Sequence, residues 1–231
     1  MKICIIGAGA MGGLYGARLI MAGEEVAFVD NRQSVIDNIN EQGFHFSGVD
    51  GEHWVPANAS LQASDYFPAD IAFVHTDTNN TAAAAIQANA VLDGSNGWCI
   101  TFQNGIGNVE TLQKELGMHR VAGGISYHSA ASPEPGHAFH TNAGKTWIGE
   151  LNQKSSERVD KLHQMLSNAG FDVQVSDDIV ATIWSKFVLN CAINPISAIT
   201  GFRTGEIGTH SAAREFQQRI LDEVLEVVDA R

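Results

Sequence analysis

Six residues near the amino terminus have the spacing of a phosphate-binding loop. They form a G-x-G-x-x-G motif that follows an apolar run and opens a segment with helical periodicity. The first glycine of such a motif allows a tight turn, the second lets the backbone approach a pyrophosphate, and the third lets the helix pack closely on the strand. The N-terminus of the helix would present free N–H groups to the phosphates. The residues that we expect to bind a dinucleotide here are Gly7, Ala8, Gly9, Ala10, Met11 and Gly12.

Two charged residues follow the second predicted strand. Asp30 lies where a carboxylate can accept hydrogen bonds from the hydroxyls of an adenosine ribose, which favours NAD(H). Arg32 could instead pair with a 2′-phosphate, which favours NADP(H). Either residue could also be a solvated charge in a turn. The two residues therefore predict a dinucleotide and leave the choice between NAD and NADP open.

Three polar residues interrupt an otherwise apolar helical segment, residues 183–194. Lys186, Asn190 and Asn194 are spaced by four, which places them in one stripe along a helix. Because a buried ammonium without a partner is costly, we expect the stripe to face a polar cleft. A lysine whose pKa is lowered by partial burial could protonate the alkoxide that remains when a hydride reduces a ketone. The two asparagines would then hold the substrate or orient Lys186.

The same stripe has a second interpretation, in which Lys186 reaches the surface along its apolar stem and the asparagines bond to nearby backbone. Pro195 is expected to kink or end the helix after Asn194, because proline removes a backbone donor.

Other candidate residues give weaker signals. Asn104 follows a predicted strand and could contact the nicotinamide ribose or the substrate, or could simply form an Asn-Gly turn. His75 ends another strand and could touch the substrate, although an ordinary strand-end histidine would look the same. His137 and His140 form an H-x-x-H pair with no third ligand in sight, so we expect no metal site.

The elements that must position these residues alternate in the manner of βαβ units. The predicted strands are residues 2–7, 25–30, 71–75, 98–102 and 120–124. The predicted helices between them are residues 11–22, 33–42, 81–90 and 109–116. Residues 125–150 are expected to add antiparallel strands to the same sheet, followed by a helix over 158–169, a strand over 171–175 and further helices. The predicted fold class is α/β, with a Rossmann-type dinucleotide-binding domain over 1–176 and a helical domain over 177–231.

The composition bounds the class of protein. The chain has 231 residues, and 14 Lys and Arg against 26 Asp and Glu give a net charge of −12. That balance argues against nucleic acid as a partner, because phosphate binding depends on clustered Lys and Arg. Three separated cysteines in apolar surroundings indicate thiols in a reducing compartment. No run approaches the roughly 18 apolar residues of a membrane span, so we expect a cytoplasmic protein with no membrane partner.

Four segments together resemble the ketopantoate reductase family, also called 2-dehydropantoate 2-reductase. They are residues 7–16, 103–110, 136–149 and 184–206. The resemblance implies NADPH-dependent reduction of a small 2-keto acid, 2-dehydropantoate, to pantoate on the route to pantothenate and coenzyme A. It also implies that Lys186 is the general acid, that Asn104 and Asn190 bind cofactor and substrate, and that Asn194 is their companion on the same helix.

The sequence departs from this family at several places. His75 stands where a lysine is common, Thr204 where an asparagine is common, and Asp30 where many members have no acid. These departures leave open a different 2-keto acid as substrate. Family members continue through further helices, so we expect the helical domain to be incomplete here, or its apolar last segment, 212–230, to be covered in a homodimer. A non-catalytic NAD(P)-binding protein is the competing hypothesis.

Overall fold

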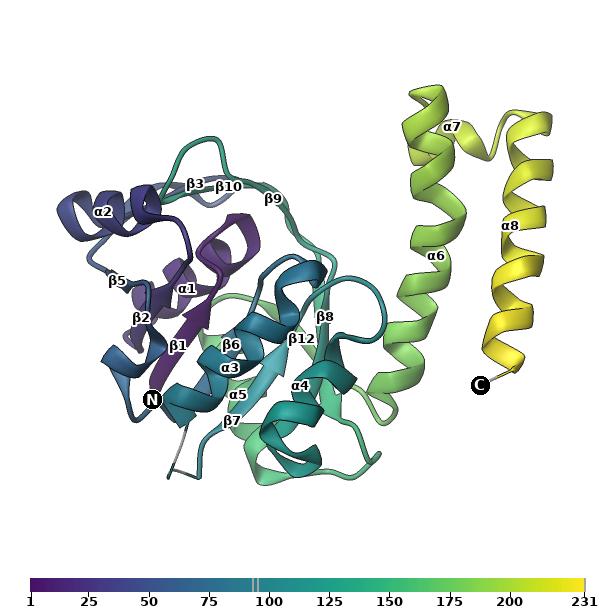
Figure 1. Cartoon of the computed structure of the whole chain (residues 1–231). Helices are drawn as coiled ribbons and strands as arrows, with labels where there is room; N and C mark the ends of the chain where they lie inside the picture. Colours follow the sequence, from purple (N-terminus) through teal and green to yellow (C-terminus); the bar gives the residue numbers. More distant parts are fainter. Residues whose placement is uncertain (93, 95, 231) are drawn as a thin grey trace. The chain divides into compact units, whose positions relative to one another are not determined.

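An eight-stranded sheet forms the centre of the first part of the chain (Figure 1). The computed structural model describes residues 1–92, 94 and 96–230, and it divides into one unit over Met1–Val180 and a second over Ala181–Arg231. The strand order is β12-β11-β8-β7-β6-β1-β2-β5. The strands are β1 (Lys2–Ile6), β2 (Glu25–Val29), β5 (Asn58–Ser60), β6 (Ile71–Val74), β7 (Trp98–Thr101), β8 (Val121–Ser126), β11 (Lys145–Glu150) and β12 (Asp172–Val175).

The strands from β5 to β8 run parallel, whereas β11 pairs antiparallel with β8 and β12 runs parallel to β11. The central strands are apolar on both faces, as expected of a parallel sheet covered on both sides. Ile3 and Ile5 of β1 join one core cluster, and Cys4 and Ile6 join the other. The sequence-based prediction of a Rossmann-type α/β sheet is confirmed.

Helices cover both faces of this sheet. Helix α1 (Ala10–Met21) and α5 (Glu157–Asn168) contribute to the cluster that contains Ile3 and Ile5. Helix α3 (Thr81–Leu92) and α4 (Asn108–Leu116) contribute to the other cluster, and α2 (Gln33–Gln42) follows β2. Three short 3₁₀ helices, η1 (Ala63–Tyr66), η2 (Thr78–Asn80) and η3 (Met118–Arg120), lie in the connections.

A second, four-stranded sheet covers α1. Its order is β4-β3-β10-β9, from β4 (Gly51–Val55), β3 (Phe44–Gly48), β10 (His137–Asn142) and β9 (Ser129–Ala131). The prediction that residues 125–150 extend the main sheet is therefore wrong for β9 and β10, and correct only for β11. Strands β3, β4 and β5 were not predicted, because they are short or rich in polar residues.

Helix α1 fits between the two sheets because it carries glycines on both sides. A Cβ at Gly16 would lie 2.3 Å from the ring of Phe28 in the main sheet. A Cβ at Gly13 would lie 2.1 Å from the ring of Phe44 in the small sheet. The close approach of both sheets to the helix therefore depends on the absence of side chains at these positions.

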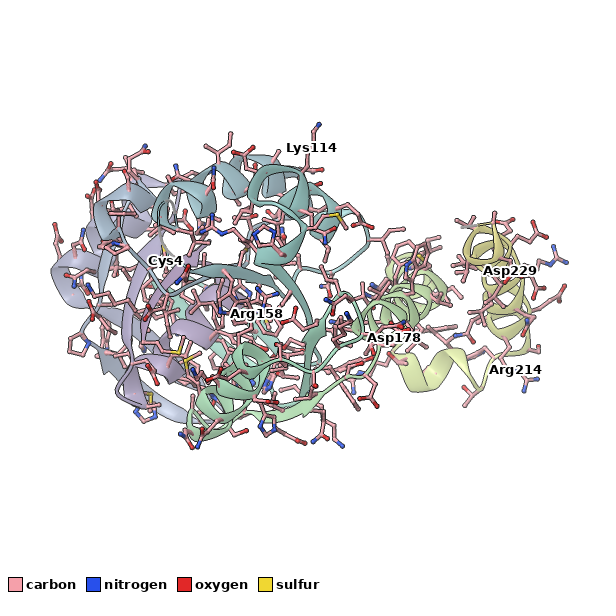
Figure 2. All side chains as sticks on the ribbon, turned by 90° about the horizontal axis from the view of Figure 1, so that it is seen from below. Cys4, Lys114, Arg158, Asp178, Arg214 and Asp229 are labelled. Atoms are coloured by element: carbon pink, nitrogen blue, oxygen red, sulfur yellow. The ribbon has the colours of Figure 1, made fainter. Side chains whose placement is uncertain are left out.

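The second unit consists of helices. They are α6 (Ile179–Thr200), α7 (Thr204–Ile207) and α8 (Ser211–Asp229), and Ile196, Ile207 and Ala213 form their small core. Figure 2 shows Asp178 just before α6, and Arg214 and Asp229 on α8. Pro195 does not end the helix, one of the two outcomes expected from the sequence, because α6 continues through Pro195 to Thr200. The loss of one backbone hydrogen bond there is offset by burial of the next residue, Ile196, which is 1% exposed.

Two expectations concern the limits of these helices. The chain divides between Val180 and Ala181, whereas the sequence placed the domain boundary after residue 176.

Among the described residues, α6 is a helix long and apolar enough to cross a membrane by length and composition, with a mean hydropathy of 1.3. This finding differs from the expectation that no segment would approach that length. It is weak evidence for a membrane, since core helices of soluble proteins pass the same test.

The third glycine of the loop gives a prediction about stability. A Cβ at Gly12 would lie 1.8 Å from the carbonyl oxygen of Gly7, a backbone atom that cannot rotate away. We expect Gly12→Ala to lower the free energy of unfolding by about 3 kcal/mol. The matched control is Gly9→Ala, where a Cβ meets no heavy atom within 4 Å and the cost should be about 1 kcal/mol or less. Urea unfolding measures both, and equal losses would contradict the proposed steric role of Gly12.

Candidate functional site

A cavity of about 510 Å³ opens at the carboxyl ends of β1, β2 and β6. Open α/β sheets bind their ligands at this edge, where the chain reverses the direction in which it adds strands. Here β1 lies between β2 and β6, and the chain adds β2 on one side before it crosses to β6 on the other. The lining residues are Ile6, Gly7, Gly9, Ala10, Met11, Val29, Asp30, Asn31, Arg32, Leu61, His75, Thr76, Asp77, Asn80, Ala83, Ala84 and Gln87.

The glycine-rich loop forms one wall of this cavity. Gly7 has φ of 101° and donates its N–H to the carbonyl of Val29 at 2.7 Å, which turns the chain from β1 toward α1. Gly9 is the N-cap of α1 and no side chain caps the helix. The first N–H groups of a helix have no acceptor within the helix, so those of the residues that line the cavity here are available to an anion.

The six predicted loop residues separate into two groups. Gly7, Gly9, Ala10 and Met11 line the cavity. Ala8 and Gly12 are buried and do not line it. Ala8 instead donates its N–H to Asp30, and Gly12 lets α1 approach the carbonyl of Gly7.

Asp30 is fixed at the end of β2 by four N–H donors. Its Oδ2 accepts from the backbone of Ala8 at 3.0 Å and from Nη2 of Arg32 at 3.1 Å. Its Oδ1 accepts from the backbone of Arg32 at 3.1 Å and from Nε of Arg32 at 2.9 Å. The hydrogen bonds that the guanidinium donates to Asp30 raise the pKa of Arg32. Both charged residues predicted from the sequence therefore line the cavity as a bidentate ion pair.

His75 contributes an uncharged ring to the same wall. The ring stacks on Phe102 at 5.5 Å and lies 4.9 Å from the ring of Tyr15. Burial lowers the pKa of His75 to about 3, so the imidazole is neutral at neutral pH. Its Nε2 is buried and has no hydrogen-bond partner among the residues that the structure describes.

Asn104 lies at the end of β7, outside the set of residues that line this cavity, with its side chain exposed. A polar network holds the backbone of this loop. The amide of Asn108 donates to the carbonyl of Asn104 at 3.0 Å and accepts from the hydroxyl of Thr81 at 2.8 Å. Gln103 donates to the same hydroxyl at 2.9 Å and to the carbonyl of Thr76 at 2.7 Å. The network thus ties the ends of β6 and β7 together.

Lys186, Asn190 and Asn194 all lie on α6, in the second unit. Lys186 and Asn190 are half-buried, and Asn194 is exposed. Burial lowers the pKa of Lys186 to about 8. The ammonium can therefore release a proton near neutral pH, which is the property required of a general acid.

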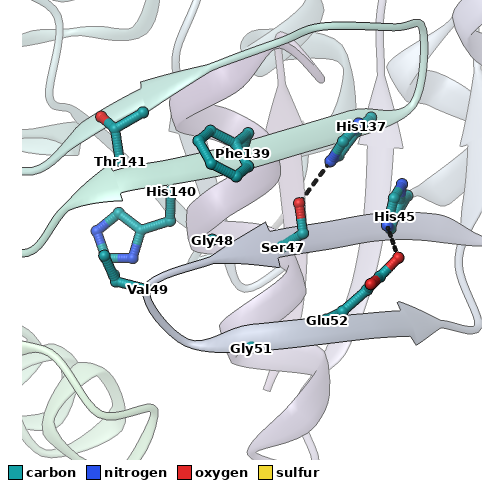
Figure 3. A pocket seen from close by; sticks show the side chains of 10 residues that line it. All are labelled: His45, Ser47, Gly48, Val49, Gly51, Glu52, His137, Phe139, His140 and Thr141. Carbon is teal, nitrogen blue, oxygen red and sulfur yellow. Dashed lines mark hydrogen bonds and ion pairs between the residues drawn. The ribbon is translucent and has the colours of Figure 1, made fainter.

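The H-x-x-H pair does not act as a unit. His137 and His140 are three residues apart on β10, so their side chains point to opposite faces of the strand. Nε2 of His137 bonds to the hydroxyl of Ser47 at 2.7 Å, in an open groove of about 700 Å³ over the small sheet (Figure 3). His140 is fully buried between Asp50 and His128. Over the described residues, no group of three His, Cys, Asp or Glu side chains could hold a metal ion.

One side of the cavity consists of residues that were not predicted from the sequence. Thr76 and Asp77 follow His75 just beyond the end of β6, and Asn80 and Gln87 come from η2 and α3. The carboxyl end of β6 was a signal that could have identified Thr76 and Asp77. Nothing in the sequence singled out Leu61, Asn80 or Gln87, because they reach the cavity through the packing of the segments that contain η1, η2 and α3.

The cavity fits a dinucleotide on three counts. It offers helix N–H groups to a pyrophosphate, a fixed carboxylate to ribose hydroxyls, and apolar walls from residues such as Leu61 and Ala84 to a base. Each feature belongs to the first unit and rests on backbone positions that the central sheet fixes.

The network beneath Asn104 gives a prediction about stability. Asn108 is 3% exposed, and Asn108→Ala removes the acceptor of Thr81 and a donor to the carbonyl of Asn104. We expect a loss of about 2 kcal/mol in the free energy of unfolding, because buried polar groups lose their partners. Asn89→Ala is the control, since this amide donates a long hydrogen bond, at 3.4 Å, to the exposed Glu115, and its loss should change stability by about 0.5 kcal/mol or less. Thermal unfolding of both variants measures these losses. An Asn108→Ala protein as stable as the wild type would refute the role of the network.

The chain matches known families and curated relatives. The family model of ketopantoate reductase PanE/ApbA matches residues 3–153, and the model of its C-terminal domain matches residues 178–231. The 2-dehydropantoate 2-reductase of Pyrococcus abyssi is 33% identical over 199 residues, which are 86% of this chain and 64% of that protein. The enzyme of the same name from Archaeoglobus fulgidus is 32% identical and aligns with 98% of this chain and 74% of its own length.

Solved structures agree with the sequence relatives. The PanE/ApbA family ketopantoate reductase from Ralstonia eutropha has a TM-score of 0.88, with 29% identity, and is covered over 74% of its length by all of this chain. A ternary structure of D-mandelate dehydrogenase with NADH and anilino(oxo)acetate has a TM-score of 0.90 with 25% identity and the same coverage. Two matching family models, relatives above 30% identity and a shared fold lead to one conclusion: this chain belongs to the ketopantoate reductase family.

Proposed function

We propose that this chain belongs to an enzyme that reduces 2-dehydropantoate to pantoate with a reduced nicotinamide dinucleotide, a step toward pantothenate and coenzyme A. The observation that carries the proposal is the cavity at the ends of β1, β2 and β6, with its open helix N-terminus and fixed carboxylate, in a chain of this family. The aligned part of the chain covers 64% of the length of the Pyrococcus abyssi relative. The activity and the substrate of the whole protein are therefore part of the proposal.

The first unit would bind the cofactor. The backbone N–H groups of Gly9, Ala10 and Met11 would hold the pyrophosphate, and Asp30 would hold the adenosine ribose. The loop of Asn104, fixed by Asn108, would present the Asn104 side chain to the nicotinamide ribose or the substrate. Ala8 and Gly12 would hold these groups in place: Ala8 donates a hydrogen bond to Asp30, and Gly12 packs closely against the carbonyl of Gly7.

The second unit would supply the proton. The bound nicotinamide would provide a hydride for the keto carbon, and negative charge would develop on the keto oxygen. Lys186 would donate its proton to that oxygen, which becomes the hydroxyl of the product. Asn190 and Asn194 lie one and two turns further along α6 and would hold the carboxylate or hydroxyl of the substrate. Residues 177–231 would accordingly be part of a domain for substrate binding and dimerisation.

The remaining proposals concern assembly and location. Phe216, Leu225 and Val227 of α8 are each about half exposed, which supports a homodimer formed through the helical unit. Cys4, Cys99 and Cys191 are free thiols, which supports a cytoplasmic location.

A second candidate substrate is another 2-keto acid. The neighbouring D-mandelate dehydrogenase supports it, as do the neutral His75 and Thr204 at positions where the family commonly has other residues. The two candidates are separated by kcat/KM for 2-dehydropantoate and for benzoylformate, the keto acid that corresponds to mandelate. We expect 2-dehydropantoate to be preferred by tenfold or more, about 1.4 kcal/mol in transition-state binding. A preference for benzoylformate would replace the proposed substrate, and cofactor binding with no turnover of either would favour a non-catalytic nucleotide-binding protein.

The role of Lys186 is tested by removal of its ammonium. We expect Lys186→Ala to lower kcat by about a hundredfold to ten-thousandfold, the usual contribution of a general acid. Lys161→Ala is the control, because Lys161 lies on α5 in an exposed pair with Glu157. The measurement is dinucleotide oxidation followed by absorbance with saturating keto acid. Full activity in Lys186→Ala would exclude the assigned role.

The pH profile tests the same role independently. A donor must be protonated, and the pKa of Lys186 is about 8, so most of the enzyme is in the active form at neutral pH and this fraction declines as the pH rises through 8. We expect kcat/KM for reduction to fall about tenfold per pH unit above pH 8. In Lys186→Arg the guanidinium stays protonated, so whatever activity remains should not show this decline. A wild-type profile that is flat to pH 9.5 would contradict the proposal.

A further inference from the structure

The adenosine end of the cavity is organised around one carboxylate. Asp30 is 7% exposed, and two of the four N–H groups that it accepts belong to the backbone of Ala8 and Arg32. These two donors come from the loop after β1 and the start of α2, so they hold the carboxylate at a fixed position. Asp30 therefore presents a negative charge at a place that the backbone defines.

The other two donors on Asp30 belong to a side chain that can leave. Nε and Nη2 of Arg32 bond to the two carboxylate oxygens, but the Arg32 side chain is 52% exposed. Its backbone is the N-cap of α2 and need not move when the side chain rotates into solvent. Two ribose hydroxyls can therefore replace the two guanidinium donors on the same two oxygens.

The charges that line the cavity disfavour an additional phosphate at this position. The ionisable lining residues are Asp30, Arg32, His75 and Asp77, which place two carboxylates against one guanidinium. His75 adds no charge, because burial lowers its pKa to about 3. A phosphate monoester carries a charge of about −1.5 to −2 near neutral pH. A 2′-phosphate would thus enter a region that is already negative, and it would compete with Asp30 for Arg32.

We propose that Asp30 makes this protein selective for NAD(H) over NADP(H), and that the ribose diol replaces the two guanidinium donors of Arg32 on Asp30. This inference rests on the proposed function, because it concerns the same cofactor site. It departs from the NADP(H) that the family resemblance implies. Asp30 would accept hydrogen bonds from the 2′- and 3′-hydroxyls of the adenosine ribose of NAD(H). In NADP(H) the 2′-hydroxyl is replaced by a phosphate, so one donor is lost and the carboxylate repels the anion that takes its place.

The test compares dissociation constants of NADH and NADPH at equal ionic strength, from the change in nucleotide fluorescence on binding. We expect the wild-type protein to bind NADH at least tenfold more tightly. Asp30→Asn should weaken NADH by about tenfold or more, since bonds to a charged acceptor are lost, and should largely abolish the discrimination. ADP-ribose and 2′-phospho-ADP-ribose, which lack nicotinamide, should show the same order in competition with NADH.

Arg32→Met separates the two possible roles of the arginine. It keeps an unbranched stem that reaches about as far as Nε of arginine and removes the donors, so we expect NADH affinity to remain within about threefold of wild type or to rise. If Arg32 instead recognised a 2′-phosphate, NADPH binding would weaken tenfold or more in this variant while NADH binding stayed constant. Asp37→Asn is the matched control, because Asp37 is an exposed carboxylate on α2 outside the cavity, and it should leave the NADH to NADPH ratio unchanged.

The outcomes separate this inference from the proposed function. Tighter binding of NADPH, or equal binding of the two nucleotides by the wild-type protein, overturns the selectivity and leaves the reductase intact. Discrimination that survives in a folded Asp30→Asn protein overturns the role of Asp30. If Asp30→Asn does not fold, the ratio of the NADH and NADPH dissociation constants of the wild-type protein, together with binding by Arg32→Met, still tests the inference. A wild-type protein that binds neither nucleotide overturns both proposals.

Discussion

The close packing of α1 between two sheets is the constraint on which the rest of this structure depends. The helix approaches the main sheet on the side of Gly16 and the small sheet on the side of Gly13, and a methyl group on either side would collide with an aromatic ring. The same helix begins at the glycine-rich loop, so its position determines where its N–H groups point. The geometry of the anion site thus follows from the packing of α1 between the two sheets as well as from the loop itself.

Asp30 connects this packing to the electrostatics of the cavity. The backbone of Ala8, in the loop that α1 fixes, donates to the carboxylate at the end of the neighbouring strand β2. A shift of α1 would therefore move a donor of Asp30 as well as the groups that face a pyrophosphate. The carboxylate and the helix N-terminus carry opposite charge, and the sheet holds them at a fixed separation. Shape and charge at this site are consequently set by the same few backbone contacts.

The sequence predicted what depends on local pattern. The alternation of apolar strands and helices identified β1, β2, β6, β7 and β8, and the glycine spacing located the loop and Asp30. It did not predict which loop residues face the cavity, because Ala8 and Gly12 differ from their neighbours in burial and not in type. It also missed the sheet position of β10, whose sequence has no continuous apolar run and pairs with a strand far away in the chain. The continuation of α6 through Pro195 reflects tertiary packing of Ile196, which local propensity does not contain.

The pairing of β3 with β10 also bears on the order in which the chain folds. His137 lies opposite His45, a separation of 137 − 45 = 92 residues along the chain. During synthesis from the amino terminus, the β3–β4 hairpin is complete long before β10 emerges, and one edge of β3 has no partner in that interval. Closing so long a loop carries an entropic cost that is recovered only when β10 arrives. The four-stranded sheet over α1 should therefore be completed late in folding. Nascent chains shorter than about 140 residues would expose an unpaired edge of β3, and such edges promote aggregation.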